Sequence, residues 1–351
     1  MAIVRQTVRE EWLALTKEEP VDPELPICDP HVHIWGLSDP RYHVAKQAGK
    51  EVRPIDSYLP DDLLRDKGTH NVVSTVFEEC ISMYRDSGPQ EMRPVGETEF
   101  VAGQSGQYGT VDVAAGIVGF ANLMLGAAVA PVIEAHIAAG RNKFRGIREI
   151  CAWPANPNLD LNGLKGVVNI PNRLLNETFR EGFACLKKYG LSLDVGLSYT
   201  QLMELVDLAR AFPDTTIIVT HCGGLSGIYP HDEKSEKAIS EWKHGITELA
   251  TCPNVFMKLG GMASRTGKWH ERAVPPGSAE LAEAMAPYIL WCIEKFGVER
   301  CMFEGNWPED KIFYSYNVIW NTFKRIVEKF SANDRLALFH DTAVRAYRLI
   351  G

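Results

Sequence analysis

The chain has 351 residues, 45% of them hydrophobic, and a formal net charge of -8 at pH 7. A chain of this length and hydrophobic content can bury a full core, as one large domain or as two or three smaller ones. The negative charge disfavours general binding to nucleic acid or anionic membranes, because both carry many negative charges. An anionic small-molecule ligand stays open, since a local group of Arg and His side chains can dominate the field in a cleft.

The first 19 residues mix charged with apolar side chains and contain no continuous apolar region like that of a secretory signal. The longest apolar stretch, residues 114–133, is interrupted by Gly, Asn and Pro residues. These interruptions favour a buried strand followed by a helix over a membrane span. We therefore expect a cytoplasmic protein that associates with neither membrane nor nucleic acid.

Short apolar segments bounded by turn residues predict eight buried strands. They are residues 25–31, 70–77, 111–119, 144–148, 191–195, 215–220, 255–259 and 300–303. Helical patterns separate nearly all of these strands or follow the last one, at residues 60–67, 94–104, 125–140, 172–189, 199–212, 235–251, 279–296, 313–330 and 333–349. Strands that alternate with helices pair in parallel through crossovers, and eight such units close into a (β/α)8 barrel, the TIM barrel.

An open doubly wound sheet is the competing fold. A Gly-rich G-x-G-x-x-G turn after the first strand would favour it, and the sequence has none there. We predict an N-terminal arm at residues 1–26 and a single barrel domain at residues 27–351. Long loops are expected to cover the carboxyl ends of the strands, at residues 36–60, 81–108, 153–171 and 225–234. Aromatic residues in or beside these loops would either line a partly apolar pocket or pack the loops down: Trp35, Tyr42, Tyr84, Tyr108, Trp153 and Tyr229.

In such a barrel the active site lies at the carboxyl ends of the strands, and here the predicted strands end in charged or imidazole side chains. These are Asp29, His31, His33, Glu78, Glu79, Arg148, Glu149, Asp194, His221, Lys258, Glu304 and Asn306. Any one of them could be a satisfied structural group. Their coincidence on one predicted face favours a functional site.

His31 and His33 are two residues apart, so an extended strand places both side chains on the same side. With His221 they offer three imidazoles, which suit a divalent ion such as zinc, and iron or manganese as alternatives. A bound divalent ion lowers the pKa of water to about 7 and polarises a carbonyl. Arg148 offers a planar fork to a carboxylate.

These motifs resemble the amidohydrolase superfamily, and more closely its amidohydrolase 2 branch, which contains sugar lactonases, 2-pyrone-4,6-dicarboxylate lactonase and several decarboxylases. The resemblance covers roughly residues 27–350 and keeps the family's order. It rests on Asp29-Pro30-His31-Val32-His33, Phe144-Arg145-Gly146-Ile147-Arg148, Leu193-Asp194, His221-Cys222-Gly223, Lys258-Leu259-Gly260-Gly261 and residues 302–308. It implies a (β/α)8 barrel in which Arg148 binds carboxylate or hydroxyl groups of the substrate.

One position departs from the family pattern, in which the last strand ends Gly-Ser-Asp-Trp-Pro and the Asp is a metal ligand or the general base. Residues 304–308 read Glu-Gly-Asn-Trp-Pro here, so Asn306 stands where the Asp is expected. An amide cannot take a proton from water near neutral pH and is a weaker, neutral ligand. The base role could pass to Glu304, Asp310 or Asp194, the metal could be held by histidines alone, or hydrolysis could be lost. Glu304 is the preferred substitute, because it lies on the same side of an ideal strand as Asn306.

We expect a metal-dependent hydrolase of a small carboxylate-bearing ring compound, with a lactone as the preferred substrate. A non-oxidative decarboxylase of an aromatic or enolic carboxylate is the main alternative, since it needs the same groups. A metal-free lactonase also stays open because of Asn306. So does a catalytically weak or redox-adapted homologue that serves as a subunit of a complex. The expected assembly is a homo-oligomer, or a hetero-complex with a related chain.

The expected residue roles follow from these positions. The catalytic residues are Glu304, Asp194, Asn306 and His221. The substrate-binding residues are Arg148, Trp35, Lys258 and Trp307. The metal ligands are His31, His33 and His221, with zinc as the first choice of metal.

Overall fold

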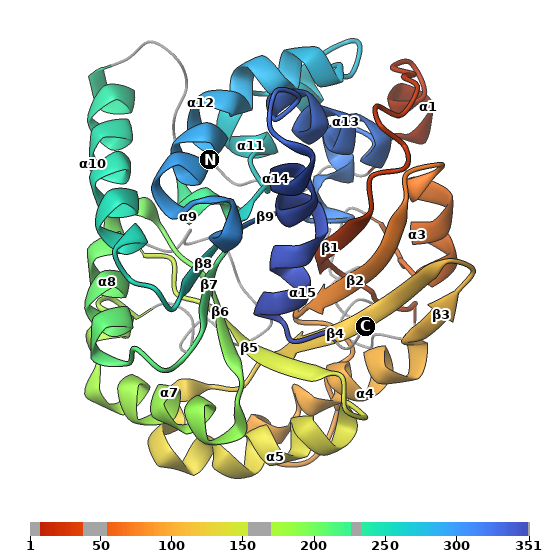
Figure 1. The fold of residues 1–351 in the computed structure, drawn as a ribbon. Coiled ribbons are helices and arrows are strands. Elements are labelled where there is room, and N and C mark those ends of the chain that lie inside the picture. Colours follow the sequence, from red (N-terminus) through yellow and green to blue (C-terminus); the bar gives the residue numbers. More distant parts are fainter. Residues whose placement is uncertain (1–7, 38–54, 154–169, 226–232, 350–351) are drawn as a thin grey trace.

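The computed structural model describes residues 8–37, 55–153, 170–225 and 233–349. In this part of the chain the strands form one nine-stranded sheet, and eight of them pair in parallel in the order β1-β2-β4-β5-β6-β7-β8-β9. Figure 1 shows these strands as a barrel surrounded by helices. The parallel strands are β1 (Ile27–Val32), β2 (Val72–Glu78), β4 (Val111–Gly119), β5 (Phe144–Ile150), β6 (Ser192–Gly196), β7 (Ile217–Val219), β8 (Val255–Leu259) and β9 (Cys301–Phe303). The predicted (β/α)8 barrel is confirmed.

The barrel closes between β9 and β1 through the backbone of Trp307. His33 N donates to Trp307 O over 2.7 Å, and Trp307 N donates to His31 O over 3.1 Å. The buried Asp29 carboxylate joins the same two strand ends, because its Oδ1 accepts from Gly305 N over 2.9 Å. These contacts bring the His-x-His segment against the segment that follows the last strand.

The longer helices lie outside the barrel in the order that the sequence predicts. The longer ones are α3 (Pro60–Lys67), α4 (Val95–Gln104), α5 (Ala130–Ala139), α7 (Glu177–Tyr189), α8 (Leu202–Ala211), α10 (Glu233–Ala250), α12 (Ser278–Phe296) and α13 (Tyr316–Ile326). Short helices are α1 (Glu10–Leu13), α9 (His221–Gly224), α11 (Ala263–Thr266), α14 (Ala332–Leu336) and α15 (Thr342–Ala346). The 3-10 segments are η1 (Gln90–Met92), η2 (Leu123–Val129), η3 (Arg173–Leu175), η4 (Tyr199–Gln201), η5 (Trp269–Glu271), η6 (Val298–Arg300) and η7 (Glu309–Ile312), and η8 (Ala337–Asp341) is a π-helix.

Three elements differ from the sequence prediction. The strand β3 (Gly106–Tyr108), which pairs antiparallel with β4, lies in a segment predicted as loop and helix. The helix expected at residues 125–140 begins only at Ala130, because Gly126 takes a left-handed conformation (φ 60°) that interrupts the preceding turn. The last helix, expected at residues 333–349, is divided by η8 into α14 and α15.

The C-terminal helix packs into the inside of the barrel. A cluster separate from the main core joins residues of α15 and its end to inward strand residues: Ala343, Ala346, Tyr347, Cys28, Val76, Val118, Ile218 and Met302. The residues from β1, β2, β7 and β9 in this cluster come two or three positions before His31, Glu78, His221 and Glu304. Since these four residues stand at the carboxyl ends, α15 closes the barrel from the opposite end. In Figure 1 it crosses the centre of the barrel.

The described part of the N-terminal arm lies against the segment that follows β8. Trp12 Nε1 donates to Arg272 O over 2.9 Å, and Thr16 Oγ1 donates to Pro275 O over 2.8 Å. The Trp12 side chain is buried. The arm therefore packs on the barrel rather than extending away from it.

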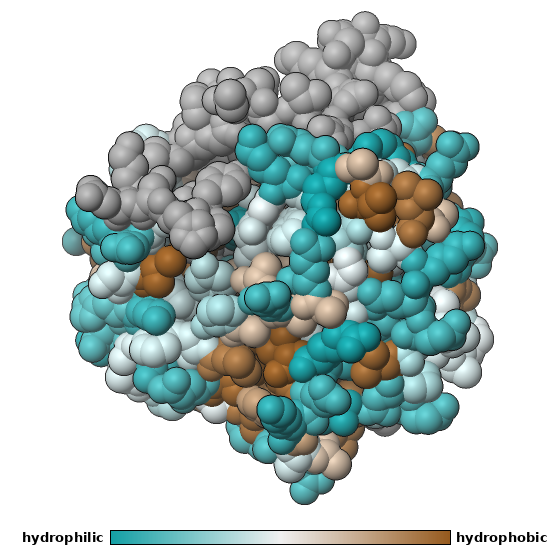
Figure 2. Space-filling view, turned by 90° about the horizontal axis from the view of Figure 1, so that it is seen from above, coloured by the Kyte–Doolittle hydropathy of each residue, from teal (hydrophilic) through white to brown (hydrophobic). Residues whose placement is uncertain are grey.

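The surface is mixed in character. Figure 2 shows a largely hydrophilic face on which hydrophobic side chains occupy smaller areas. Large exposed hydrophobic side chains of the described chain are Leu15, Leu37, Ile137, Leu175, Met203, Val274 and Leu290. Among the described helices, none combines the length and the apolar character needed to cross a membrane.

Candidate active site

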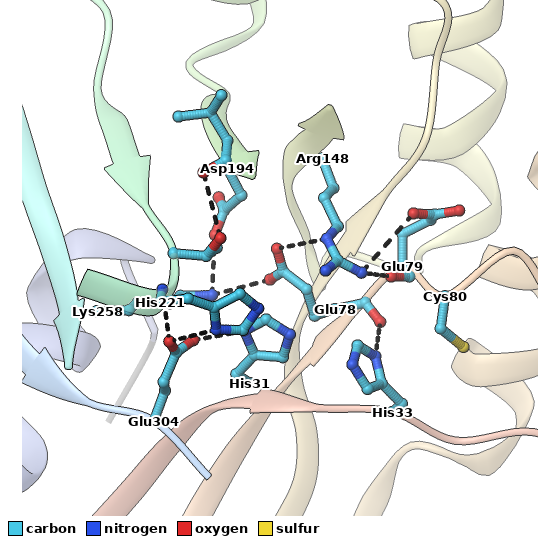
Figure 3. Close-up of polar contacts among 12 residues, drawn as sticks. His31, His33, Glu78, Glu79, Cys80, Arg148, Asp194, His221, Lys258 and Glu304 are labelled. Carbon is cyan, nitrogen blue, oxygen red and sulfur yellow. Dashed lines mark hydrogen bonds and ion pairs between the residues drawn. The ribbon is translucent and has the colours of Figure 1, made fainter. Parts of the chain in front are cut away.

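The carboxyl ends of β1, β7 and β9 bring His31, His221 and Glu304 together (Figure 3). Among the described residues, they form the group of three metal-ligand side chains whose donor atoms all lie within 4.8 Å of one another. Glu304 Oε2 is 2.5 Å from His31 Nδ1, and Glu304 Oε1 is 2.8 Å from His221 Nδ1. One buried carboxylate therefore bridges two imidazoles.

The protonation states in this group follow from burial and pairing. Burial lowers the pKa of His31 and of His221, and the neighbouring Glu304 only partly opposes this. Burial alone would raise the pKa of Glu304, but the two histidines together hold it well below its usual range. Glu304 is thus ionised and only accepts hydrogen bonds, so each Nδ1 carries the proton and each Nε2 carries the lone pair.

His31 Nε2 is one of the buried polar atoms that have no hydrogen-bond partner within the described part of the chain. Leaving a buried acceptor unpaired costs about 1–3 kcal/mol, so a metal ion or a hydrogen-bond donor is expected there. A histidine that ligates a metal through one nitrogen commonly donates its other N–H to a carboxylate, as His31 does to Glu304. The residues present therefore fit a divalent metal ion.

His33, the third predicted ligand, lies beside this group rather than within it. Its ring is 4.9 Å from the His31 ring, edge to face, whereas the His221 ring is stacked 4.9 Å from His31 on another side. His33 Nδ1 donates to the Glu78 carbonyl oxygen over 2.7 Å. A carbonyl cannot donate, so Nδ1 of His33 carries a proton. The three histidines form a row with His31 in the middle.

The backbone around His221 adopts unusual conformations and lies close to its neighbours. His221 and Asn306 adopt left-handed conformations with φ of 56° and 47°. Such conformations in residues other than glycine concentrate at functional sites. A Cβ on Gly261 would lie 1.9 Å from His221 Nδ1, and one on Gly260 would lie 2.2 Å from Glu304 O. The two glycines after β8 are therefore required by the site itself.

A buried ionic layer adjoins the histidines. Lys258 Nζ is 3.0 Å from Glu78 Oε2 and 3.0 Å from Asp194 Oδ2, and all three side chains are buried. The Tyr347 hydroxyl donates to Asp194 from the C-terminal helix side. Burial and the nearby Asp194 raise the pKa of Glu78 to about 8, although Lys258 and Arg148 oppose the shift. Lys258 and Asp194, predicted as substrate-binding and catalytic, thus contact each other inside the barrel.

Arg148 lies at the edge of this layer. Its Nε is 3.6 Å from Glu78 Oε1, and its Nη1 donates to the Glu79 carbonyl oxygen. The side chain is 11% exposed. The next residue, Glu149, points to the other face of the strand, where its Oε2 lies 2.7 Å from Arg173 Nη2. Arg148, and not Glu149, therefore faces the histidines.

Both predicted substrate-binding tryptophans are buried in packing contacts. Trp35 Nε1 donates to Ile55 O over 3.2 Å, and its ring packs 6.3 Å from that of Tyr58. Trp307 Nε1 donates to the Tyr58 hydroxyl over 2.8 Å and to Asp66 Oδ2 over 3.0 Å. These contacts join β1, the segment before α3 and the end of β9. In the described structure, both rings therefore pack against neighbouring elements.

Asn306 is held by a buried carboxyl. Its Nδ2 donates to Asp310 Oδ1 over 2.8 Å, and the Tyr314 hydroxyl donates to Asp310 Oδ2 over 2.6 Å. Burial raises the pKa of Asp310 to about 7 in spite of these two donors. The amide that replaces the expected aspartate is therefore paired with a carboxyl group one helical turn further along the chain.

Parts of the predicted mouth lie outside the described residues. These are 38–54, 154–169 and 226–232, with Tyr42 and Tyr229. Of the other aromatics, Tyr84 donates to Glu79 Oε1 over 2.7 Å and Tyr108 donates to Gln104 O over 2.9 Å. The Tyr84 hydroxyl therefore joins its loop to the end of β2, and the Tyr108 hydroxyl joins β3 to the end of α4.

Sequence reasoning did not single out Tyr347 or Arg265. Tyr347 sits in an ordinary helical pattern, and only the insertion of α15 into the barrel brings it to Asp194. Arg265 follows the Gly260-Gly261 pair, and its Nη1 donates to Gly261 O over 2.6 Å. The Gly260-Gly261 pair is the sequence signal that could have drawn attention to Arg265.

A (β/α)8 barrel with an imidazole–carboxylate group at its strand ends defines a class of barrel enzymes whose chemistry takes place at that end. The chain belongs to the amidohydrolase family, because the model of that family matches residues 28–349. It is therefore an amidohydrolase-family enzyme.

Two relatives and one solved structure are similar to this chain. The uncharacterized protein y4mH of Sinorhizobium fredii is 33% identical over 332 residues, covering 93% of this chain and 99% of its own. An L-fucono-1,5-lactonase of Burkholderia ambifaria is 26% identical over 296 residues, covering 76% and 87%. A crystal structure of a Burkholderia multivorans amidohydrolase with bound zinc has a TM-score of 0.67 at 22% identity, covering 92% and 99%. The last likeness shows a shared fold.

Proposed function

We propose that the protein is a metal-dependent hydrolase that opens a carboxylate-bearing lactone. The observation that carries this proposal is the buried Nε2 of His31, which has no hydrogen-bond partner among the described residues although Glu304 and His221 hold the ring in place. A lactonase among the relatives and zinc in a structure with the same fold support it. The substrate would be a small ring compound, because side chains fill the interior of such a barrel and leave its strand ends for binding.

His31 and His221 would hold the ion through Nε2, with His33 beside them, and Glu304 would fix the two rings through their Nδ1 atoms. When bound, a divalent ion polarises a carbonyl and lowers the pKa of water. Zinc is our first choice because imidazole and carboxylate donors suit it, and manganese or iron accept the same donors. The hydrogen bond from each Nδ1 to Glu304 would keep the Nε2 lone pairs of His31 and His221 directed at the site.

Arg148 would anchor the carboxylate of the substrate. Its separation of 3.6 Å from Glu78 Oε1 is longer than a hydrogen bond, and Glu78 is shared with Lys258 at 3.0 Å. A substrate carboxylate can therefore compete for the guanidinium and form the bidentate contact that Glu78 does not make. Lys258 and Asp194 would act as positioning residues that keep Glu78 in place.

We assign the proton transfer to Asp310 rather than to Glu304. A pKa held well below the usual range makes Glu304 a weak base, whereas the pKa of Asp310 is about 7. In the reaction, water adds to the ring carbonyl carbon, the ring C–O bond breaks, and the ring oxygen leaves as a hydroxyl. Asp310 would take a proton from water and return it to that oxygen, with Asn306 hydrogen-bonded to it at 2.8 Å.

The test is a substrate panel on the purified protein. Sugar lactones and pyrone carboxylates are followed by acid release, and aromatic carboxylates by carbon dioxide release. We expect acid release from carboxylate-bearing lactones, at least 100-fold slower in His31→Ala, since His31 supplies the central ligand. His340→Ala is the matched control, because His340 contacts Asp341 at the surface over 2.8 Å. Release of carbon dioxide without acid would show a decarboxylase in place of the lactonase. If the protein releases neither acid nor carbon dioxide, the result favours a binding subunit.

A further inference from the structure

The N-terminal arm contacts the segments that follow the last two barrel strands. The match to the family model begins at residue 28, so the arm lies outside the part of the chain that this model describes. Trp12 Nε1 donates to Arg272 O over 2.9 Å, in the segment between β8 and α12. Glu18 Oε1 accepts from Ser278 N over 2.7 Å at the start of α12. The arm is therefore fixed along the segment that follows β8.

A second set of contacts joins the arm to η7, the turn that follows β9. Lys311 Nζ of η7 lies 2.7 Å from Glu10 Oε1 in α1 and 2.8 Å from Asp66 Oδ1 in α3. The Lys311 side chain is 5% exposed, while that of Glu10 is 69% exposed. A buried ammonium needs such counter-charges, because its desolvation is otherwise uncompensated. Lys311 is therefore held from outside the barrel by the arm and by α3, and α1 and α3 lie next to each other (Figure 1).

The same turn carries Asp310, the proposed base. Asp310 directly precedes Lys311, and consecutive residues of a 3-10 helix point about 120° apart, so the two side chains leave the turn in different directions. The Asp310 carboxyl is influenced by two hydrogen-bond donors and by two charged groups. These are Asn306, Tyr314, Arg265 and Glu304. A displacement of Lys311 would therefore move Asp310 away from the groups that hold it.

We propose that Lys311 is a positioning residue that holds Asp310 in the site, and that the N-terminal arm secures Lys311 through Glu10. The inference rests on the proposed function, because it takes Asp310 as the base. It goes beyond that function by giving the arm a part in turnover. A reacting group displaced by about 1 Å can lose about 100-fold in rate, so a contact outside the site can control the reaction.

Amide hydrogen exchange of the whole chain tests the hold of the arm on η7 without turnover. Lys311→Met should speed exchange of η7 by about 10-fold or more. Glu10→Gln alters an exposed side chain, so this variant keeps the fold even if Lys311→Met unfolds. It should speed exchange of η7 by about 2- to 5-fold, the effect of a partly exposed ion pair. Both variants should leave exchange in β8 and β9 unchanged, and Glu11→Gln, at an exposed carboxylate of the same helix, is the matched control.

Turnover tests the link to Asp310. On a lactone that the wild type opens, Lys311→Met should lower kcat by about 10- to 100-fold and change KM by less than about 3-fold, with the metal content unchanged. Burial raises the pKa of Asp310 to about 7, so an Asp310 that loosens into water should shift the acid limb of the pH–rate profile to lower pH. Lys311→Arg, which keeps the cation, should recover part of the rate and most of the profile. A loss caused only by instability would lower the amount of active protein without shifting the profile.

The two measurements separate this inference from the proposed function. Unchanged exchange of η7 in both Lys311→Met and Glu10→Gln would overturn the inference. Faster exchange together with an unshifted pH profile would show that Lys311 does not position Asp310. If the wild type hydrolyses no lactone but both variants speed exchange of η7, the proposed function fails and the hold of the arm on η7 stands.

Discussion

Lys258 is the cation on which the buried ionic layer depends. Its Nζ lies 3.0 Å from both Glu78 and Asp194, and none of the three side chains is exposed to solvent. Lys258→Met would leave two carboxylates facing each other without a shared cation. Removing one partner of a buried ion pair costs about 3–5 kcal/mol, because the remaining charge stays buried. We therefore predict that the free energy of unfolding falls by about this amount.

Urea unfolding followed by circular dichroism at pH 7 measures this loss. Lys187→Met is the matched control, since Lys187 pairs with Asp214 at 2.6 Å but both side chains are more than half exposed. It should cost no more than about 1 kcal/mol. Adding Asp194→Asn to Lys258→Met should restore part of the stability, because it removes one of the unpaired charges. A Lys258→Met variant as stable as Lys187→Met would refute the buried ionic layer.

Three further predictions concern stability and local order. Tyr347→Phe removes the hydroxyl that donates to Asp194, and urea unfolding should show a free energy of unfolding lower by about 1.5–3 kcal/mol. The control Tyr189→Phe removes an exposed hydrogen bond to Glu134 and should cost less than about 1 kcal/mol. Because burial raises the pKa of Asp310 to about 7, its stabilising contribution is complete below about pH 4 and is lost as the pH rises through 7. Asp310→Asn should therefore flatten the decline of the thermal midpoint between about pH 5 and 8, and an unchanged slope would contradict the shift. Trp12→Ala should speed amide hydrogen exchange in residues 268–277 and leave exchange in the barrel strands unchanged.

The barrel could be predicted from sequence because each strand is an apolar run with a helix pattern after it. The hydrophobic period and the composition of a segment are local properties, so they can be recognised without knowledge of the fold. The strand β3 was missed because its residues, Gly106–Tyr108, carry no apolar run and pair only through the backbone of β4. The division of the last helix was missed because residues 333–349 form one continuous helical pattern, and nothing in that pattern marks the π-helix at Ala337–Asp341.

The candidate site could be predicted as a set of positions but not as a set of contacts. Strand ends identified His31, His221 and Glu304, and the structure brings these three together. Which carboxylate contacts which imidazole depends on how the barrel closes. No sequence pattern gives the distance between two such groups. Trp35 and Trp307 show the converse, since aromatic residues beside site motifs are buried in packing contacts here. Sequence position alone does not separate a pocket wall from a core.

The central claim is that His31 and His221, oriented by Glu304, hold a metal ion, and elemental analysis of the purified protein tests it most directly. We predict about one zinc, manganese or iron per chain, the content of a single catalytic site. His340→Ala should retain the ion, while His31→Ala and Glu304→Gln should lose most of it on dialysis. A wild-type protein that contains no metal and takes up none of these ions when they are added would contradict the claim.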